Sequence, residues 1–452
     1  HHYGEEVRCV AIVPSTSVLQ WEAEIKRWTP GFTVEKIPPK THKKVRLETY
    51  AKPWNILVMG YHAFSKDFAN VVKCGAKQSI VDDVDPILDH RNATHNAIVS
   101  LTRTCDLNIV MNATISSMRA EQVYSATNLV GGSSIWGSLT NFTRNYIKKD
   151  KVWVTNRKGE KVRTFQTVGY KNLKDMMSKL RPMLIRYSYE DIADDLNIPD
   201  VVPQEVMLEM SPAQKRKMQE LQSGVRTVLN NKGMPTAQKS INALTLYAYA
   251  SQITSGIFAL KTSDGGFEPD SAQASPKADW LMNKLTGEWK NEKVIVYVKY
   301  KGSHLALSER FKKAGIGYSI ISGAITDPQE RQAEIDRFWN DPDTKVILIS
   351  RSGERSLNLQ NARITVVYDQ IVNPGVFTQV AGRSRRVGSN HGSVFLISLI
   401  MEDTHEERIP LALASRQAFQ DYVYDEAQDP DDNGTYLFQK LTPDQLLKLL
   451  AP

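Results

Sequence analysis

The segment 377–388 places side chains suited to phosphate chemistry at fixed spacing. Gln379, Arg383 and Arg386 stand in the pattern Q-x-x-G-R-x-x-R-x-G, directly downstream of the apolar run 364–368. Arginine is always charged and presents a rigid planar fork of donors, so it suits a phosphoryl group that gains charge in a transition state. The pattern therefore predicts two arginines that act on a phosphate. The alternative is an exposed basic helix, the usual meaning of a short arginine cluster.

Two blocks of alternating strand and helix patterns would position such side chains. This alternation predicts an α/β fold with parallel sheets covered by helices. The region from about 135 to 270 differs, because it is richer in helix formers, and Ser211 with Pro212 makes a good helix start. The expected strands are 10–13, 55–59, 79–81 and 107–110 in the first block and 293–297, 318–321, 345–349, 364–368 and 393–397 in the second, with a helix at 18–28.

Four consecutive parts follow from these patterns and from the shifts in composition between them. The turn-rich residues 262–271 separate the helical region from the second α/β block, and residues 425–432 are acidic. We therefore expect a first α/β lobe at 1–195, a helical linker at 196–274, a second α/β lobe at 275–424, and an acidic tail with a short helix at 425–452.

The overall composition is that of an ordinary globular protein, with 41% hydrophobic and 24% charged residues. A formal net charge of +7 favours a polyanionic partner. No run approaches the roughly 20 apolar residues of a membrane span, so no membrane is expected. Cys9, Cys74 and Cys105 are scattered and form no CxxC pair. Such cysteines indicate a reducing compartment and argue against a zinc site or a disulfide framework.

From about Val10 to Ile409, a series of short segments resembles the Swi/Snf-like branch of the superfamily-two helicases, in the order found in that family. The run Leu-Asn-Leu-Gln at 357–360 matches a signature of this branch. Gln20 and Trp21 resemble its first DNA-contacting motif. The resemblance implies two RecA-like lobes and an ATPase that uses Mg²⁺ and moves along double-stranded DNA without separating the strands.

The resemblance also implies roles for individual residues. Asp82 would hold Mg²⁺ through water, and Asp83 stands where the family usually has the glutamate that positions the attacking water. Arg383 and Arg386, with Gln379, would reach from the second lobe to nucleotide held by the first. A solvated acidic turn is the alternative for the two aspartates. Further implied roles are nucleotide binding for Gly353, Gly382 and Asp85, coupling for Ala113 and Thr114, and DNA contact for Ser15, Thr16, Gln20, Tyr61, Ser322, Gly323, Asn358 and Gln360.

Trp21 has a second interpretation beside DNA contact. Trp21 and Trp28 lie seven residues apart on one face of the predicted helix 18–28. Apolar side chains at helical spacing are typical of a face that packs into a core. We therefore interpret both tryptophans as core residues.

Several departures from the family pattern concern catalysis. No Gly-Lys-Thr or Gly-Lys-Ser phosphate cradle stands at a strand-to-helix turn, and only nine residues precede Val10. We expect that the sequence begins after that cradle, because a parallel lobe without its first strand would be an incomplete core. Asp83 is one methylene shorter than glutamate, Ile115 replaces a proline, and Glu354 brings negative charge to a loop that is glycine-rich in the family.

These departures support a second interpretation, a hydrolysis-deficient subunit of the same fold that clamps DNA or serves as a scaffold. An RNA helicase is a third, which the Gln-Trp and Leu-Asn-Leu-Gln runs argue against. The compact chain favours a bacterial or viral protein in the cytoplasm, associated with the nucleoid. Its expected partners are duplex DNA and other proteins of a DNA-processing or viral assembly.

Overall fold

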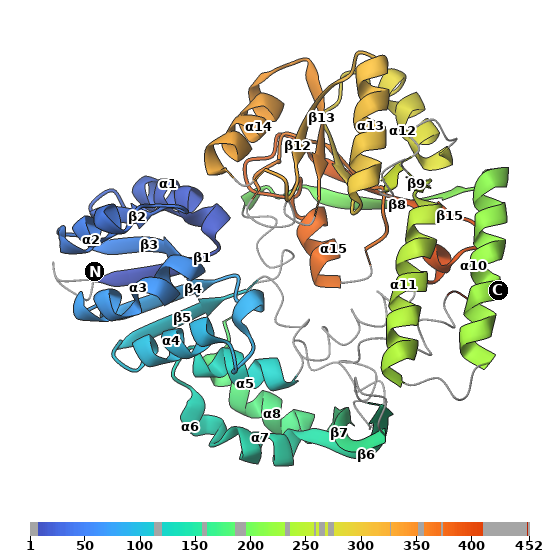
Figure 1. The fold of residues 1–452 in the computed structure, drawn as a ribbon. Helices are drawn as coiled ribbons and strands as arrows, with labels where there is room; N and C mark the ends of the chain where they lie inside the picture. Colours follow the sequence, from blue (N-terminus) through green and yellow to red (C-terminus); the bar gives the residue numbers. More distant parts are fainter. Residues whose placement is uncertain are drawn as a thin grey trace. The chain divides into compact units, whose positions relative to one another are not determined.

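The computed structural model describes residues 8–112, 120–155, 161–185, 196–230, 236–256, 259–261, 267–269, 275–325, 327–350, 357–371, 374–409 and 450. The chain divides into two compact units, coloured from blue to red along the sequence in Figure 1. The first unit comprises 1–148, 167–184 and 430–438, and the second comprises 149–166, 185–429 and 439–452.

A five-stranded parallel sheet, ordered β2-β3-β1-β4-β5, forms the centre of the first unit. All five residues of β1 are buried, as expected for a central parallel strand with both faces covered. The strands are β1 (Cys9–Val13), β2 (Val34–Ile37), β3 (Ile56–Gly60), β4 (Gln78–Asp82) and β5 (Leu107–Met111), and the helices between them are α1 (Val18–Trp28), α2 (Lys43–Ala51), α3 (Tyr61–Lys73) and α4 (Ala93–Thr102), with 3-10 turns at Ser15–Ser17 and Asp85–Ile87.

Strand β5 is an edge of this sheet. It pairs with β4 on one side, and no strand in the part of the chain that the structure describes pairs with the other. Leu107, Ile109 and Met111 alternate along it and are 43%, 41% and 36% exposed. One face of this strand is therefore apolar and partly exposed.

Short helices complete the first unit around a group of aromatic rings. The rings of Trp136, Phe142 and Tyr146 contact one another, with centroids 5.0 to 5.5 Å apart. Such pairs add stability beyond the area that they bury. The elements are α5 (Ala120–Asn128), α6 (Ser133–Trp136), α7 (Leu139–Tyr146), α8 (Leu173–Leu180) and a turn at Arg181–Met183, with the two-stranded sheet of β6 (Ile147–Thr155) and β7 (Lys161–Tyr170) joined to them in sequence.

The second unit contains a six-stranded parallel sheet, ordered β12-β13-β11-β14-β15-β8. Two parallel sheets covered by helices confirm the predicted α/β fold with RecA-like lobes. The strands are β8 (Asp200–Leu208), β11 (Val294–Tyr297), β12 (Gly317–Ile321), β13 (Thr344–Ile349), β14 (Ile364–Val367) and β15 (Ser393–Met401), and the helices are α12 (Pro276–Thr286), α13 (Lys301–Lys313), α14 (Pro328–Asn340) and α15 (Pro374–Ala381), with a turn at His405–Arg408.

Strand β8 lies within the region that the sequence indicated to be a helical linker, 196–274. It pairs with β15 over its whole length and forms one edge of the sheet. Its residues are exposed or half-buried, and it contains Pro203, which is tolerated at a sheet edge. A strand without a buried apolar run gives little signal in the sequence. The predicted boundaries of the linker remain a prediction.

The predicted helix start at Ser211 is confirmed. The Ser211 Oγ accepts a hydrogen bond from the backbone N–H of Gln214 (3.3 Å), and the Gln214 side chain accepts one from the backbone of Ser211 (2.9 Å), which forms a capping box. Helix α10 (Pro212–Asn230) packs on α11 (Thr236–Thr254) through buried apolar side chains, and the strands β9 (Ala259–Lys261) and β10 (Phe267–Pro269) follow. Among the described helices, none combines the length and the apolar character needed to cross a bilayer.

Candidate functional site

Polar side chains follow the strands of the first sheet at its carboxyl edge. Ser15 and Thr16 follow β1, Tyr61 follows β3, and Asp82 is the last residue of β4. Asn112 follows β5 directly. The carboxyl ends of parallel strands meet at one edge, which is where open α/β sheets bind ligands. The structure therefore brings together residues that lie up to about a hundred positions apart in the sequence.

Residues from two other predicted motifs donate hydrogen bonds to Asp82, one to its side chain and one to its backbone. The Trp21 Nε1 donates a hydrogen bond to its Oδ2 at 3.0 Å, across 61 residues of sequence. The Tyr61 hydroxyl donates to its backbone oxygen. Asp82 is thus fixed at the end of β4 by helix α1 and by the first residue of α3.

The two tryptophans of α1 differ in their surroundings, which corrects one interpretation. Trp28, the last residue of the helix, is 70% exposed, and its Nε1 donates to Glu24 Oε2 at 2.9 Å. The assignment of Trp28 to the core was therefore wrong. Trp21 is half-buried and packs against the apolar cluster of β1. Helical spacing fixes the face of the helix, but it does not fix how far along the helix that face is covered.

Asp83 has a backbone conformation that is unusual for a residue other than glycine. Its φ is +55°, in the left-handed region, and its N–H donates to the Met111 carbonyl at 3.0 Å. Aspartate and asparagine enter this region more readily than longer side chains. The backbone therefore gives a structural reason for aspartate at this position. Nearby, the Asn112 side chain donates to Asp85 Oδ1 at 2.9 Å, which links the ends of β4 and β5.

Some of the predicted residues lie outside the part of the chain that the structure describes. These are the coupling residues Ala113 and Thr114, and Gly353 of the nucleotide set. The departures Ile115 and Glu354 also lie outside it. Their predicted roles are untested.

In the second unit, the arginine motif contacts the Leu-Asn-Leu-Gln run directly. Arg383 is only 4% exposed, and its Nη1 donates to the backbone oxygen of Leu357 at 3.0 Å. The Arg386 Nη1 donates to Asn358 Oδ1, and its Nε donates to the Gly382 oxygen at 3.3 Å. Helix α15 ends at Ala381, before both arginines. The alternative of an exposed basic helix is therefore wrong for this segment.

The predicted glutamines near this motif hold buried oxygen atoms. The Oε1 atoms of Gln360 and Gln379 are buried and have no hydrogen-bond partner among the described residues.

Ser322 and Gly323 follow β12 at the carboxyl edge of the second sheet, and the Ser322 Oγ accepts a hydrogen bond from the Ala324 N–H at 3.3 Å.

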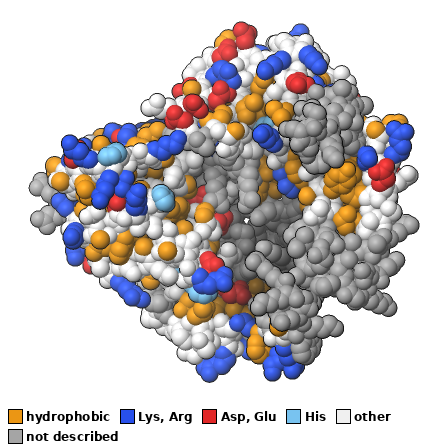
Figure 2. All heavy atoms as spheres, in the orientation of Figure 1, with side chains coloured by type: hydrophobic (Ala, Val, Ile, Leu, Met, Phe, Trp, Pro, Cys, Tyr) orange, Lys and Arg blue, Asp and Glu red, His pale blue; other side chains and the backbone are white. Residues whose placement is uncertain are grey.

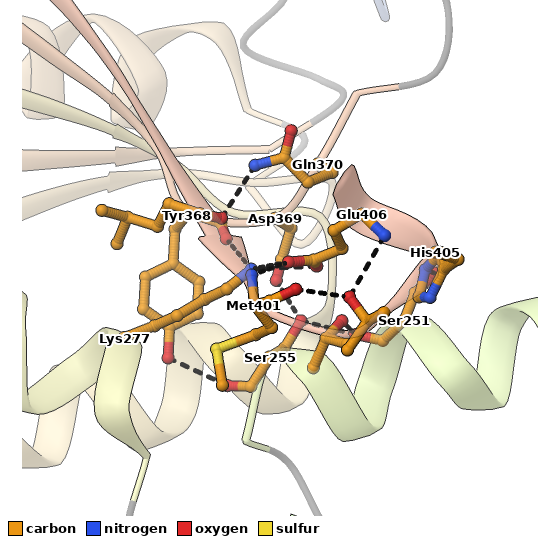
Figure 3. Close-up of polar contacts among 12 residues, drawn as sticks. Ser251, Ser255, Lys277, Tyr368, Asp369, Gln370, Met401, His405 and Glu406 are labelled. Carbon is orange, nitrogen blue, oxygen red and sulfur yellow. Dashed lines mark hydrogen bonds and ion pairs between the residues drawn. The ribbon is translucent and has the colours of Figure 1, made fainter. Parts of the chain in front are cut away.

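A buried ionic network in the second unit was not found by sequence reasoning (Figure 3). Lys277 and Glu406 are 0% and 1% exposed, and the Lys277 Nζ lies 2.8 Å from the nearer carboxylate oxygen. The same Nζ donates to the backbone oxygen of Tyr368 at 3.0 Å. Lys277 lies near the start of the second lobe. Nothing in the sequence around it indicated an ion pair with Glu406, which lies 129 residues away.

Asp369 is a second buried carboxylate of this network. The N–H groups of Lys299 and Tyr300 donate to its Oδ2 at 2.7 and 3.2 Å, and the Ser255 hydroxyl donates to its Oδ1. Burial raises the pKa of Asp369, and it lowers the pKa of His405 to about 4. These contacts join the end of α11, the start of α13 and the carboxyl end of β14. Figure 3 shows Ser255 and Asp369 among them. The network thus fixes the strand from which the chain continues to α15.

Comparison with protein families agrees with this architecture of two sheets, each with polar side chains at its carboxyl edge. The model of the SNF2-related domain matches residues 2–262, and that of the helicase conserved C-terminal domain matches residues 276–388. The first match alone covers more than half of the 452 residues. The chain therefore belongs to the SNF2-related family, a group of helicase-fold proteins, and the resemblance inferred from its motifs is confirmed.

Curated relatives share this family along most of the chain. An uncharacterised ATP-dependent helicase of Mycoplasma pneumoniae is 23% identical over 97% of this chain and 38% of its own length. The putative ATP-dependent helicase/translocase YwqA of Bacillus subtilis is 22% identical over 91% and 43%, and the chicken (Gallus gallus) DNA repair and recombination protein RAD54-like is 21% identical over 93% and 60%. The chain thus spans less than two thirds of each. The solved SWI2/SNF2 ATPase core of Sulfolobus solfataricus in complex with dsDNA matches with a TM-score of 0.41, at 18% identity over 93% of this chain and 82% of that chain.

Proposed function

We propose that this chain is the motor region of an ATP-driven translocase that moves on double-stranded DNA and displaces or remodels bound protein. The observation that carries the proposal is the hydrogen bond from Arg386 to Asn358. The first residue belongs to the predicted catalytic set, and the second belongs to the predicted DNA set. A motor needs such a link, because hydrolysis must respond to the presence of the track.

The residues at the end of β4 fit a Mg²⁺–ATP complex. Mg²⁺ keeps several waters and is usually bound by one or two carboxylates together with substrate phosphates. The described residues contain no group of three or more acidic, histidine or cysteine side chains that could hold a metal ion. Asp82 would hold the hydrated ion, and bound Mg²⁺ supplies neutralisation of phosphate charge. Asp83 would orient the attacking water.

The DNA-contacting residues suit a track that is followed without regard to sequence. Hydroxyl and amide groups that bond to backbone phosphates fix position and carry no base information. The first unit offers Ser15, Thr16 and Tyr61 at its carboxyl edge, and the second offers Asn358 and Gln360. The net charge of +7 would attract DNA at long range. Movement would come from cycles of closing and opening of the two units.

A hydrolysis-deficient clamp of the same fold is the second candidate. It is favoured by the burial of Arg383 inside the second unit, where its guanidinium donates to the backbone oxygen of Leu357. Asp83 also stands where the family usually has glutamate. Such a subunit would bind duplex DNA in a larger assembly without turning over ATP.

ATP hydrolysis by the full-length protein, with duplex DNA, with RNA and without nucleic acid, separates these functions. We expect turnover that duplex DNA stimulates and RNA does not. Arg386→Ala should abolish turnover and spare duplex binding. Arg385→Ala is the control and should keep turnover, because the Arg385 Nε donates to the backbone oxygen of Pro199 at 3.2 Å. Duplex binding without turnover in the wild-type protein would establish the clamp. DNA binding that is insensitive to salt would contradict both, because phosphate contacts release counterions.

A further inference from the structure

Strands β6 and β7 form a small sheet of their own, between the two parallel sheets in the sequence. Over their 9 and 10 residues they carry five Lys and Arg and one Asp, a net charge of +4, whereas the whole chain carries +7. In Figure 2, Lys and Arg side chains lie beside hydrophobic ones over the elements that Figure 1 labels β6 and β7. This strand pair therefore holds a large share of the net positive charge.

One side of the strand pair brings basic side chains to an aromatic ring. Side chains two positions apart in a strand point to the same face. Lys149 and Lys151 therefore share a face of β6, and Arg163 and Phe165 share a face of β7. The Lys151 Nζ lies 5.6 Å from the centroid of the Phe165 ring, so both rows lie on the same side of the sheet. We call these four residues the basic face.

The ring of Phe165 is open to solvent on the basic face. It is 63% exposed, and the three basic residues of this face are exposed as well. A lysine over a ring makes only a weak cation–π contact where both are exposed, so this contact alone gives little reason for a phenylalanine here. Exposed aromatic rings among cationic side chains are typical of surfaces on which the bases of a nucleic acid stack.

The end of β7 is anchored, which holds the basic face in position. The Thr167 Oγ1 and the Tyr170 hydroxyl donate to the two carboxylate oxygens of Glu121 in α5, at 3.3 and 3.4 Å. The Lys171 N–H donates to the Tyr146 oxygen at 3.0 Å. A two-stranded sheet is only marginally stable by itself in water. These bonds at its base therefore help the strand pair to present its outer residues to a ligand.

Charge and ring together favour a nucleic acid strand with unpaired bases. Lysine and arginine neutralise backbone phosphates. A phenylalanine ring has no group that could bond a phosphate or a base edge, so it gains only from the face of a base. Stacked pairs cover these faces in a duplex, whereas an unpaired base presents its whole π-face. A single strand supplies one such ring for every phosphate. An acidic polypeptide would match the charges without a regular partner for the ring.

We propose that the basic face binds single-stranded nucleic acid, with a base stacked on Phe165 and phosphates held by the three basic side chains. Single-stranded DNA and RNA share this chemistry, because neither contact needs the 2′-hydroxyl. The residues belong to neither parallel sheet, so this site is separate from the residues expected to follow duplex DNA. It would direct the chain to places where a strand is unpaired, and it does not depend on ATP hydrolysis.

Binding of labelled oligonucleotides to the full-length protein tests the proposal. Oligo(dT), oligo(U), an abasic oligomer, a blunt DNA duplex and polyglutamate are each titrated at one salt concentration. Phe165→Ala should weaken binding of the single strands by about tenfold, as expected for loss of one stacked base, and Phe165→Trp should not, because an indole also stacks. Binding of the abasic oligomer and of the duplex should stay unchanged. Val162→Ala is the matched control, because Val162 is an exposed apolar residue on the opposite face of β7.

Salt dependence tests the phosphate contacts separately. Each phosphate that a single strand gives up to a cationic side chain contributes roughly 0.7 to the slope of log affinity against log salt. Lys151→Gln should therefore lower this slope by about 0.7 for oligo(dT). An unchanged slope would remove Lys151 from the contact with phosphate.

The ligands also decide between the possible partners. Because Phe165 is exposed, Phe165→Ala should keep the wild-type unfolding temperature. A loss of affinity for oligo(dT) alone would identify DNA as the strand, and a loss for oligo(U) alone would identify RNA. Wild-type affinity of Phe165→Ala for both would overturn the proposal, and so would an equal loss for the duplex or for polyglutamate. A wild-type protein without ATP turnover would refute the proposed motor and leave this result intact, because the readout is binding.

Discussion

The bond between Arg386 and Asn358 predicts opposite effects for two substitutions at one position. Arg386 is held in the second unit by Asn358 Oδ1 and by the Gly382 oxygen. We infer that this bond holds Arg386 back from nucleotide until DNA engages Asn358. Asn358→Ala removes that bond and should raise ATP turnover measured without DNA. Asn358→Asp replaces a neutral acceptor with a carboxylate, strengthens the hold on Arg386 and should lower this turnover.

The magnitude follows from the type of bond. A hydrogen bond that involves a charged group contributes about 1.5–3 kcal/mol, and the half-buried position of Asn358 favours the lower end. About 1.4 kcal/mol corresponds to a tenfold change in population. Asn358→Ala should therefore raise DNA-independent turnover by up to about tenfold. It should also reduce the ratio by which DNA stimulates turnover.

Steady-state ATP hydrolysis by the full-length protein, over a series of duplex concentrations that includes zero, measures both effects. Urea unfolding of each variant controls for loss of structure. The Trp339 Nε1 bonds the backbone oxygen of Asn358 at 2.8 Å, so the loop keeps one anchor in both variants. A change of DNA-free turnover in the same direction for Asn358→Ala and Asn358→Asp would refute the reasoning.

Three further predictions concern the first sheet edge and the buried network. Asp83→Asn should abolish turnover with a stability change within about 0.5 kcal/mol, because asparagine also accepts a φ of +55°; retained turnover would remove Asp83 from the catalytic set. Gly60→Ala should lower stability by about 1–3 kcal/mol through the 2.5 Å contact with the Ser15 Oγ. Thermal unfolding should show that Ser15→Ala in the same chain restores part of the loss, because the Ser15 Cα and Cβ would still stand 3.2 and 3.3 Å from the added Cβ. His405 stays neutral when folded, with its pKa lowered to about 4 from 6.5, whereas the unfolded chain takes up a proton as the pH falls below about 6.5. Urea unfolding should therefore show about 2 kcal/mol less stability at pH 5 than at pH 7 from this group, a loss that His405→Gln should not share.

The strands that the sequence indicates most clearly are the central ones, which are buried on both faces. Residues 10–13 and 294–297 are apolar runs in central strands, and burial of both faces leaves a continuous signal in the sequence. Strand β8 could not be found this way, because an exposed edge strand that contains Pro203 has no such run. Trp28 shows the same limit for helices, since its spacing matched a buried face that ends before the helix does.

The candidate site was predictable as a set of segments, but not as a set of contacts. The order of the motifs indicated Asp82, Arg386 and Asn358, because each belongs to a recognisable run. The bond from Trp21 to Asp82 spans 61 residues and depends on the order of strands in the sheet.

The position of β5 at the edge of its sheet, with a partly exposed apolar face, has a consequence for the association state of the polypeptide. An edge strand presents a row of backbone donors and acceptors on which another chain can add a strand, and exposed apolar side chains favour that addition. Leu107, Ile109 and Met111 supply such side chains along one face. A polypeptide of residues 1–452 alone is therefore expected to self-associate as its concentration rises, through intermolecular β-pairing. A charge at the middle position, as in Ile109→Lys, is the gatekeeper that natural edge strands use against such pairing, and it should keep that polypeptide monomeric.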